Sequence, residues 1–299
     1  MTQSTPSPPP SSALLPSLAV AATIFTWATS FPAIGFALRE IAPLPLASIR
    51  FAIAAVIALG LLAWRRPRGL TRRDAGTVVL CGVLGIALYN VFLNSGQTTV
   101  SSGAAAFIVN TQPLFMAILA VLVLGETFNR WGWIGAGLGF TGVAIIAAGQ
   151  PGGLSFGTGA SLILGAAFCA ASYSVLQRPL FARVAAFDVT LLVLVAGAVA
   201  LLPWLAEGWQ QAAGARPETL LTVLFLAIAP GLVGQSCWAY AIGYFGAARA
   251  GQFLYLIPPG SVLIAWPLLG EVPKVETLLG GALALAGVIV VNSRGRTRS

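Results

Sequence analysis

Amide, hydroxyl and aromatic side chains recur at helical spacing inside the most apolar stretches of this 299-residue chain. Asn90, Asn94 and Gln97 follow one another at i, i+4 and i+7, which puts them on one face of a helix. Such groups donate and accept hydrogen bonds without carrying charge, so the set predicts a site for a nearly neutral, amphipathic solute. The candidate binding residues are Trp27, Ser30, Tyr89, Asn90, Asn94, Asn110, Tyr173, Gln177, Gln235, Trp238, Gln252 and Tyr255.

The same side chains have a purely structural interpretation. Polar residues in membrane helices hydrogen-bond neighbouring helices for about 0.6 to 2 kcal/mol each. For any single residue this interpretation is as good as solute contact. The set favours solute binding because polar positions match between the two halves of the chain, Asn90 with Gln235 for example, where a cavity at the bilayer midplane would form.

Catalysis lacks the residues that it needs. The chain contains no histidine, and its eight carboxylates all fall at or near the expected ends of helices. General acid and base catalysis, and tight proton coupling through a side chain, both require a poised titratable group in the interior. Cys81, Cys169 and Cys237 are far apart in sequence and suit small apolar fillers rather than a disulfide or metal site. We therefore expect no enzyme activity, no cofactor and no metal.

Two segments, residues 113–146 and 258–291, resemble each other at a constant offset of 145 residues. The half of the chain that contains each segment has room for five membrane crossings. Because five is odd, the second half is inverted relative to the first. Inverted halves around a shared centre are typical of secondary transporters, in which one half rocks against the other. The matched pairs are Pro113/Pro258, Gly125/Gly270, Glu126/Glu271, Gly135/Gly280 and Gly142/Gly287.

Composition predicts a polytopic membrane protein. Hydrophobic residues make up 58% of the chain, charged residues only 8%, and the mean hydropathy is +0.90. We expect an all-α integral membrane fold with ten transmembrane helices in two inverted five-helix repeats around a central cavity. Residues 13–149 form the first repeat and 154–293 the second, after a disordered cytoplasmic tail of residues 1–12. The expected crossings are 13–38, 46–64, two within 74–126 with a break at 95–102, two within 130–178 with a break at 149–153, 189–206, 219–241, 247–269 and 275–292.

The basic residues predict the orientation. With a cytoplasmic N-terminus, twelve of the sixteen Lys and Arg residues lie inside, so both termini are expected in the cytoplasm. The net charge of +8 then forms a cytoplasmic rim that meets anionic lipid headgroups, and no soluble domain offers a basic face to nucleic acid. The exceptions, expected outside, are Arg39, Arg50, Arg216 and Lys274.

Proline interrupts several of the expected helices. Pro113 removes an amide hydrogen that would bond the carbonyl of Val109, and Pro258 and Pro259 act similarly in the ninth helix, as does Pro32 in the first. A freed carbonyl in a membrane must face protein or water, so these prolines mark either cavity walls or hinges. Both roles suit a transporter.

Arg50 has two interpretations. It lies about one turn into the second helix, near enough to the outer interface for its guanidinium to reach it. This is the interpretation that we expect to hold. Alternatively, Arg50 meets a carboxylate inside a cavity that opens to the outside.

Glycine predicts how the fifth and tenth helices pack. Gly135 and Gly139 form a small-xxx-small pair that Gly280, Ala284 and Gly287 match in the tenth helix, which permits close backbone approach. These helices could pack against each other or form a homodimer. Glu126 and Glu271, each after a glycine at a helix end, are expected to cap or pair at the boundary.

The chain resembles the drug/metabolite transporter superfamily in its EamA-type branch. The resemblance rests on Trp27 to Pro32, the Arg50-Phe51 pair, and the Pro-to-Gly-Glu segments 113–126 and 258–271, each followed by a glycine-rich helix. It covers nearly the whole chain and is strongest to exporters of aromatic amino acids in a bacterial inner membrane. It implies a basket-like bundle around a central cavity and export of amino acids.

The residues and the resemblance together predict an exporter of aromatic and other hydrophobic amino acids, facilitative or weakly coupled, that works by alternating access. Aromatic walls with neutral amides suit a zwitterion that carries a ring. They suit cationic drugs equally, so a multidrug or metabolite efflux protein of the same fold is the alternative.

Overall fold

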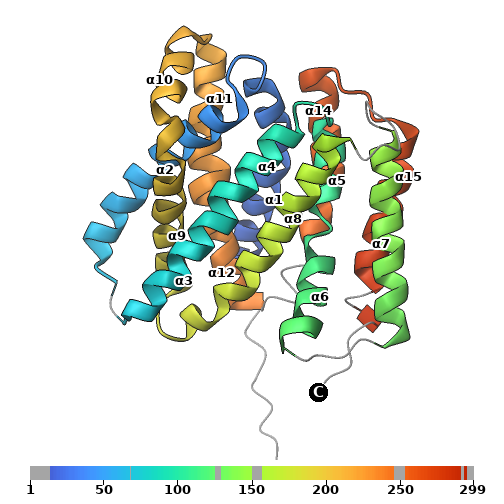
Figure 1. The fold of residues 1–299 in the computed structure, drawn as a ribbon, viewed down its shortest axis with the longest axis horizontal. Coiled ribbons are helices and arrows are strands. Elements are labelled where there is room, and N and C mark those ends of the chain that lie inside the picture. Colours follow the sequence, from blue (N-terminus) through green and yellow to red (C-terminus); the bar gives the residue numbers. More distant parts are fainter. Residues whose placement is uncertain are drawn as a thin grey trace, which may run out of the picture.

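The computed structural model describes residues 14–67, 69–124, 129–149, 157–245, 253–290 and 293–294, and every regular element in these ranges is helical (Figure 1). The predicted tail, residues 1–12, lies outside them. The first half contains α1 (Leu14–Ala37), α2 (Pro43–Arg65), α3 (Arg72–Gly82), η2 (Val83–Leu88), α4 (Tyr89–Gly96), α5 (Ser102–Val109), α6 (Gln112–Leu124) and α7 (Arg130–Ala148). The second contains α8 (Thr158–Leu176), η3 (Arg178–Ala182), α9 (Ala186–Leu201), η4 (Leu202–Trp204), α10 (Leu205–Gly214), α11 (Pro217–Ile228), η5 (Ala229–Gly234), α12 (Gln235–Phe245), η6 (Leu254–Leu256), α14 (Ile257–Leu269) and α15 (Val275–Val290).

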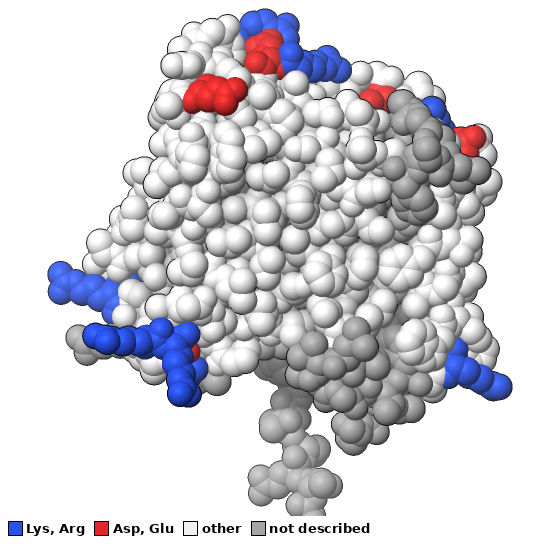
Figure 2. All heavy atoms as spheres, viewed as in Figure 1, with Lys and Arg blue, Asp and Glu red and all other residues white. Residues whose placement is uncertain are grey.

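Length and polarity of these helices suit a membrane. Among the described residues six helical segments are long and apolar enough to cross it, and α14 with its preceding turn and α15 are shorter apolar helices. Figure 2 shows basic and acidic groups at the two ends of the visible face, with an uncharged band between them. The six spans are Leu14–Ala37, Pro43–Arg65, Arg72–Gly96, Thr158–Phe181, Ala186–Gly214 and Pro217–Trp238.

The third predicted crossing ends, and the fourth begins, where the sequence indicates. α4 ends at Gly96, and α5 begins at Ser102 after Ser101, whose hydroxyl caps the helix by accepting from the amide of Ala104. Serine is a favoured N-cap because its oxygen bonds an amide that lacks a helical partner. The predicted break at 95–102 is therefore confirmed.

Two π-helical turns interrupt α-helices at matching places in the two halves of the chain. η2 occupies Val83–Leu88, and η5 occupies Ala229–Gly234, 146 residues later. Each lies between an α-helix on its N-terminal side and one on its C-terminal side that carries candidate binding residues. π-Helical turns are rare and occur often at functional sites. The sequence pattern does not predict them.

α7 and α15 pack against each other along their glycine faces, at one side of the bundle (Figure 1). A Cβ atom on Gly142 would collide with the carbonyl oxygen of Gly280 and the backbone of Ala284. A Cβ on Gly287 would meet the backbone of Gly135 and Gly139 in the same way. The small-residue stripes of the fifth and tenth predicted helices are thus used for packing within one chain.

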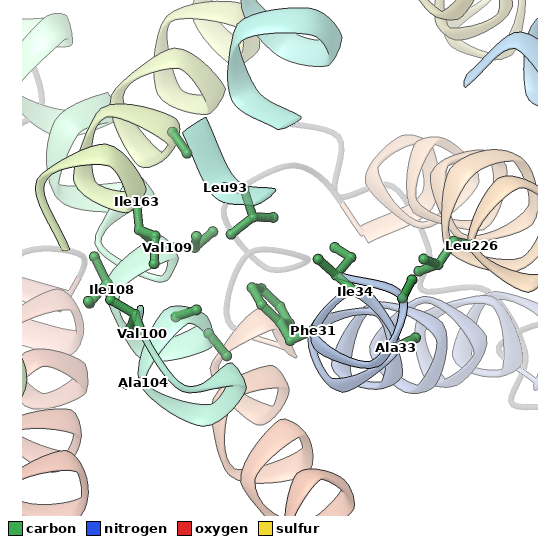
Figure 3. Packing of buried hydrophobic residues seen from close by; sticks show 14 of the residues in the cluster. Phe31, Ala33, Ile34, Leu93, Val100, Ala104, Ile108, Val109, Ile163 and Leu226 are labelled. Carbon is green, nitrogen blue, oxygen red and sulfur yellow. The ribbon is translucent and has the colours of Figure 1, made fainter. Parts of the chain in front are cut away.

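Buried apolar side chains hold the centre of the first half to the start of the second (Figure 3). Phe31 and Ile34 of α1 lie in one buried cluster with Leu93 of α4, Val109 of α5 and Ile163 of α8. Ile34 and Ile163 are at most 1% exposed. Trp27 and Tyr89, both candidate binding residues, pack against this cluster.

Ion pairs occur near helix ends. Asp188, in the first turn of α9, accepts from the Nε of Arg65 at 2.5 Å, and Asp74, in the first turn of α3, accepts from Arg183 at 2.6 Å. Glu40, in the turn after α1, pairs with Arg216 just before α11. These positions agree with the expectation that carboxylates lie at helix boundaries.

The prolines occupy two kinds of position, the interior of a helix and its first turn. Pro32 lies inside an unbroken α1, whereas Pro113 lies in the first turn of α6, directly after the interruption at Asn110 and Thr111. Pro258 and Pro259 lie in the first turn of α14, where no amide hydrogen is needed. The first part of the predicted ninth crossing, residues 247–252, lies outside the described residues.

Candidate functional site

Arg50 is buried in the bundle, and this corrects the expectation that it reaches the outer interface. Its residue is only 5% exposed. It lies seven residues after Pro43, about 10 Å along α2 at 1.5 Å per residue. Its Nη1 donates to Oδ1 of Asn90 over a long 3.4 Å, and its guanidinium carbon lies 4.7 Å from the centre of the Phe51 ring. A helix-end spacing argument missed this because it counts only distance along the chain.

Asn90 and Asn94 lie on the face of α4 that meets α2, one turn apart. Besides accepting from Arg50, Asn90 donates from Nδ2 to the carbonyl oxygen of Ile86 in η2, at 2.7 Å. Asn94 donates to the carbonyl of Pro43 at the start of α2, at 3.0 Å, while its Oδ1 has no partner among the described residues. Both residues are at most 3% exposed. The polar stripe predicted on this helix is therefore an interior stripe.

Gln97 ends the stripe at the C-terminal end of α4. Its Nε2 donates to the carbonyl of Phe31 at 3.0 Å and to the hydroxyl of Ser102 at 3.4 Å, and its Oε1 is buried without a partner in the described part of the chain. Buried acceptors without partners are costly and uncommon. Asn94 and Gln97 thus offer two free acceptor oxygens on one helix face, one turn apart.

Trp27 and Trp238 form an aromatic pair between α1 and α12. Their ring centres are 5.7 Å apart at an interplanar angle of 53°. The Nε1 of Trp27 donates to the carbonyl of Pro230 at 3.2 Å, and Thr23, one turn earlier, donates to the carbonyl of Gly234 at 3.3 Å. Two successive turns of α1 therefore bond the π-helical segment η5 of the other half.

Tyr173 of α8, in the second half, makes the corresponding contact with the π-helical turn η2 of the first half. A Cβ atom on Gly85 in η2 would overlap the Tyr173 ring, which shows that the ring lies directly against that π-helical turn. Tyr173 comes 146 residues after Trp27, the same offset that separates η2 from η5. Each half thus lays an aromatic ring against the π-helical turn of the other half.

Other predicted residues lie at the edges of this arrangement. Ser30 donates to the carbonyl of Trp27, and Asn110, at the end of α5, donates to Ala106. Gln177 follows the last residue of α8, and Tyr255 packs against Leu114 and Val288. Gln235 is half-buried at the start of α12, and Gln252 lies outside the described residues.

One polar contact escaped the sequence analysis. Gln112, directly before Pro113, donates to the hydroxyl of Ser174 at 3.1 Å and to the carbonyl of Ala170 at 3.4 Å. It joins α6 to α8 next to Tyr173. Its position beside a helix-breaking proline is the signal that could have identified it.

The titratable groups in the described part of the chain lie mostly at helix ends. The described part of the chain contains no group of three or more His, Cys, Asp or Glu residues that could hold a metal ion. The carboxylates of Glu40, Asp74 and Asp188 engage Arg216, Arg183 and Arg65 at helix ends. The interior of the described part contains the guanidinium of Arg50, a set of amides and a group of aromatic rings.

Comparison with known proteins gives a consistent result over almost the entire chain. A model of the EamA-like transporter family matches residues 14–148 and 157–293. The probable terminal-alkyne amino-acid exporter of Streptantibioticus cattleyicolor is 36% identical over 290 residues, which cover 94% of this chain and 95% of that protein. The uncharacterized transporter YdfC of Bacillus subtilis is 30% identical over 88% of this chain and 86% of its own length.

More distant relatives extend the same pattern. The uncharacterized inner membrane transporter YedA of Escherichia coli K12 is 28% identical and covers 91% of this chain and 89% of its own length. A chain of known crystal structure superposes with a TM-score of 0.60 over 91% of this chain and 95% of its own, at 18% identity. That likeness concerns the fold alone.

Proposed function

Because the chain belongs to the EamA-like transporter family, we propose that it exports aromatic and other hydrophobic amino acids across a bacterial inner membrane. Transport is by alternating access, either facilitative or weakly coupled, and involves no covalent chemistry. The substrate range and any coupled ion are for experiment to define.

One observation carries the choice of cargo: the interior combines a buried guanidinium, amide oxygens without partners and an aromatic pair. The guanidinium of Arg50 suits a carboxylate, and the free oxygens of Asn94 and Gln97 suit an ammonium group. The Trp27 and Trp238 rings suit an apolar or aromatic side chain. An amino-acid zwitterion presents these three kinds of group.

The similarity to the probable terminal-alkyne amino-acid exporter supports the same cargo class. That name describes an amino acid whose side chain ends in an apolar, unsaturated group. At 36% identity the two chains share a family, and their substrates are expected to share the amino-acid backbone more closely than the side chain.

Three findings support an architecture of ten crossings in two inverted halves, 13–149 and 154–293. The family model matches two separate segments of similar length. The π-helical turns recur 146 residues apart, and each faces an aromatic ring from the other half. With ten crossings, both termini would lie on one side, and the Arg-rich connections favour the cytoplasmic side.

The alternative is a multidrug or metabolite efflux protein. Aromatic walls bind organic cations as well as amino acids, so the tryptophan pair alone does not separate the two functions. Arg50 does, because a buried guanidinium that pairs with no carboxylate in the described part of the chain repels a cationic drug. Amino acids are therefore favoured.

The test is substrate flux through the purified protein in liposomes. Radiolabelled phenylalanine, tryptophan and leucine should equilibrate down their gradients without a pH difference, faster than in protein-free liposomes. Cationic dyes and amines, added in excess, should compete weakly with phenylalanine. The absence of flux for every amino acid in the panel would refute the proposal, and strong competition by cationic dyes would favour the efflux alternative.

A further inference from the structure

Arg50 is a buried cation whose described surroundings supply no anion. The residue is 5% exposed, and among the described residues its Nε has no hydrogen-bond partner and its one hydrogen bond is the long contact with Asn90. A guanidinium has five N–H donors, and an ion buried in a membrane normally pairs with a group of opposite charge. The Phe51 ring offsets part of the charge but accepts none of these hydrogen bonds in the way a carboxylate does.

The carboxylates on helices that pack against α2 are engaged or distant. Asp188 of α9 pairs with Arg65, fifteen residues and about 22 Å further along α2. Glu207 of α10 accepts from Gln211, and Glu218 of α11 is exposed in that helix's first turn. No described carboxylate is therefore available to Arg50.

We propose that Arg50 binds the α-carboxylate of the transported amino acid, and that the free oxygens of Asn94 and Gln97 accept from its ammonium group. This inference rests on the proposed function and names the atoms that recognise the substrate. A carboxylate can accept two parallel hydrogen bonds from one guanidinium, and Arg50 has its Nε free for this purpose. The oxygen of Asn90 holds Nη1 and so fixes the orientation of the guanidinium.

The position of the site adds a conformational consequence. Asn90 bonds Arg50 through its oxygen and the η2 carbonyl of Ile86 through its nitrogen. A carboxylate bound at the Nε edge of Arg50 leaves both bonds in place, so Arg50 and Asn90 connect the substrate to the π-helical turn. The proposed carboxylate site is thus linked through two hydrogen bonds to a segment of irregular helix geometry.

The experiment measures ligand binding separately from flux, on the full-length protein in detergent. Thermal stabilisation is titrated with phenylalanine, with phenylalanine amide, which lacks the negative charge, and with inorganic phosphate. Wild-type protein should bind phenylalanine about tenfold or more tightly than the amide, and phosphate should not substitute for it. Equal binding of phenylalanine and its amide, or equal stabilisation by phosphate, would overturn the assignment.

Variants then test whether Arg50 causes the preference for phenylalanine over phenylalanine amide. Arg50→Lys retains the charge but loses the planar, two-pronged donor, so its preference for phenylalanine over the amide should shrink to less than about threefold. Arg50→Gln should fold and show no preference, because it removes a buried charge. The matched control is Arg39→Gln, since Arg39 also stacks on a phenylalanine, Phe36, but is exposed. Full preference in Arg50→Lys, or its loss in Arg39→Gln, would contradict the proposal.

Flux in liposomes distinguishes this inference from the proposed function. Arg50-dependent binding of phenylalanine without any flux would count against export and leave the carboxylate site intact. Flux of phenylalanine and its amide at equal rates would count against the carboxylate site and leave export intact.

Discussion

Glu271, just beyond the end of α14, accepts hydrogen bonds from Ser102 at the start of α5, both from its backbone N–H at 2.8 Å and from its hydroxyl at 3.1 Å. The two residues are 169 positions apart in the chain. A carboxylate at this place accepts from an amide that lacks a helical partner. Its negative charge is also stabilised by the positive N-terminal end of the α5 dipole. The prediction that Glu271 caps at a boundary is confirmed, whereas Glu126 lies outside the described residues.

Replacing Glu271 should loosen this connection. Glu271→Ala is expected to lower stability by about 1 to 2 kcal/mol, because it leaves the Ser102 amide and hydroxyl without their acceptor. The measurement is the apparent Tm of the purified protein in detergent. Glu218→Ala, which removes an exposed carboxylate from the first turn of α11, should cost less, and equal losses in the two variants would contradict the cap.

A methyl group on the glycine stripe of α7 should separate it from α15. Gly142→Ala is expected to cost about 1 to 3 kcal/mol through overpacking, since its Cβ would meet the Gly280 carbonyl and the Ala284 backbone. Gly137→Ala is the matched control on the same helix, because a Cβ there meets nothing within 4 Å. That control should be neutral or stabilising by up to about 1 kcal/mol. A Tm in Gly142→Ala as high as in Gly137→Ala would exclude close packing of these helices.

In the proposed site, the ring of Trp27 and its indole N–H should contribute separately to phenylalanine binding. Trp27→Phe keeps a ring against Trp238 but loses the hydrogen bond to Pro230, which should weaken phenylalanine binding by about threefold to fivefold. Trp27→Ala also removes the aromatic wall and should weaken it by about tenfold or more. Both are measured as the half-saturating concentration for flux in liposomes. Trp64→Ala serves as control because Trp64 is 78% exposed, and unchanged flux in Trp27→Ala would remove Trp27 from the site.

The pair between Glu40 and Arg216 should respond to acid. The backbone N–H of Arg216 and then its side chain donate to Glu40 and lower the pKa of this carboxyl below its ordinary value of 4.5. A group with a lowered folded-state pKa stabilises the fold above its unfolded pKa and loses that contribution as the pH falls through the folded value.

The corresponding measurement compares the Tm of wild type and Glu40→Gln across pH. The difference between them should be constant from about pH 8 to 6 and should close progressively below pH 4.5, the ordinary value of the carboxyl. A difference that grows on acidification would mean that the pair contributes in the opposite sense. Because both side chains are partly exposed, added salt should reduce the difference.

Features that depend on chain chemistry alone were predictable. The break around 95–102, the interruption beside Pro113 and the glycine faces of α7 and α15 follow from capping, a missing amide and small-residue spacing. The stripe of Asn90, Asn94 and Gln97 also lies on one buried face, as a period of 3.6 predicts.

The features that escaped prediction depend on contacts between distant segments. Arg50 was expected near the surface because it lies close to the start of its helix. The distance from the helix start carries no information on how α4 and α9 pack around it. Tyr173 was not matched with Trp27, because a repeat offset of 145 residues pairs Trp27 with Ser172 instead. The π-helical turns were not foreseen either, because their hydrogen-bond register depends on how the flanking helices pack.

The π-helical turns also change which face of a helix each residue beyond them occupies. Each accommodates one residue more than a regular turn, so the chain beyond it is rotated by about 100° relative to a continuous α-helix. Asn90 is the second residue after η2, and Gln235 is the first after η5. A helical wheel drawn straight through Arg72–Gly96 therefore mixes two registers, and deleting one residue from η2 would swing the amides of α4 away from α2 towards a different neighbour.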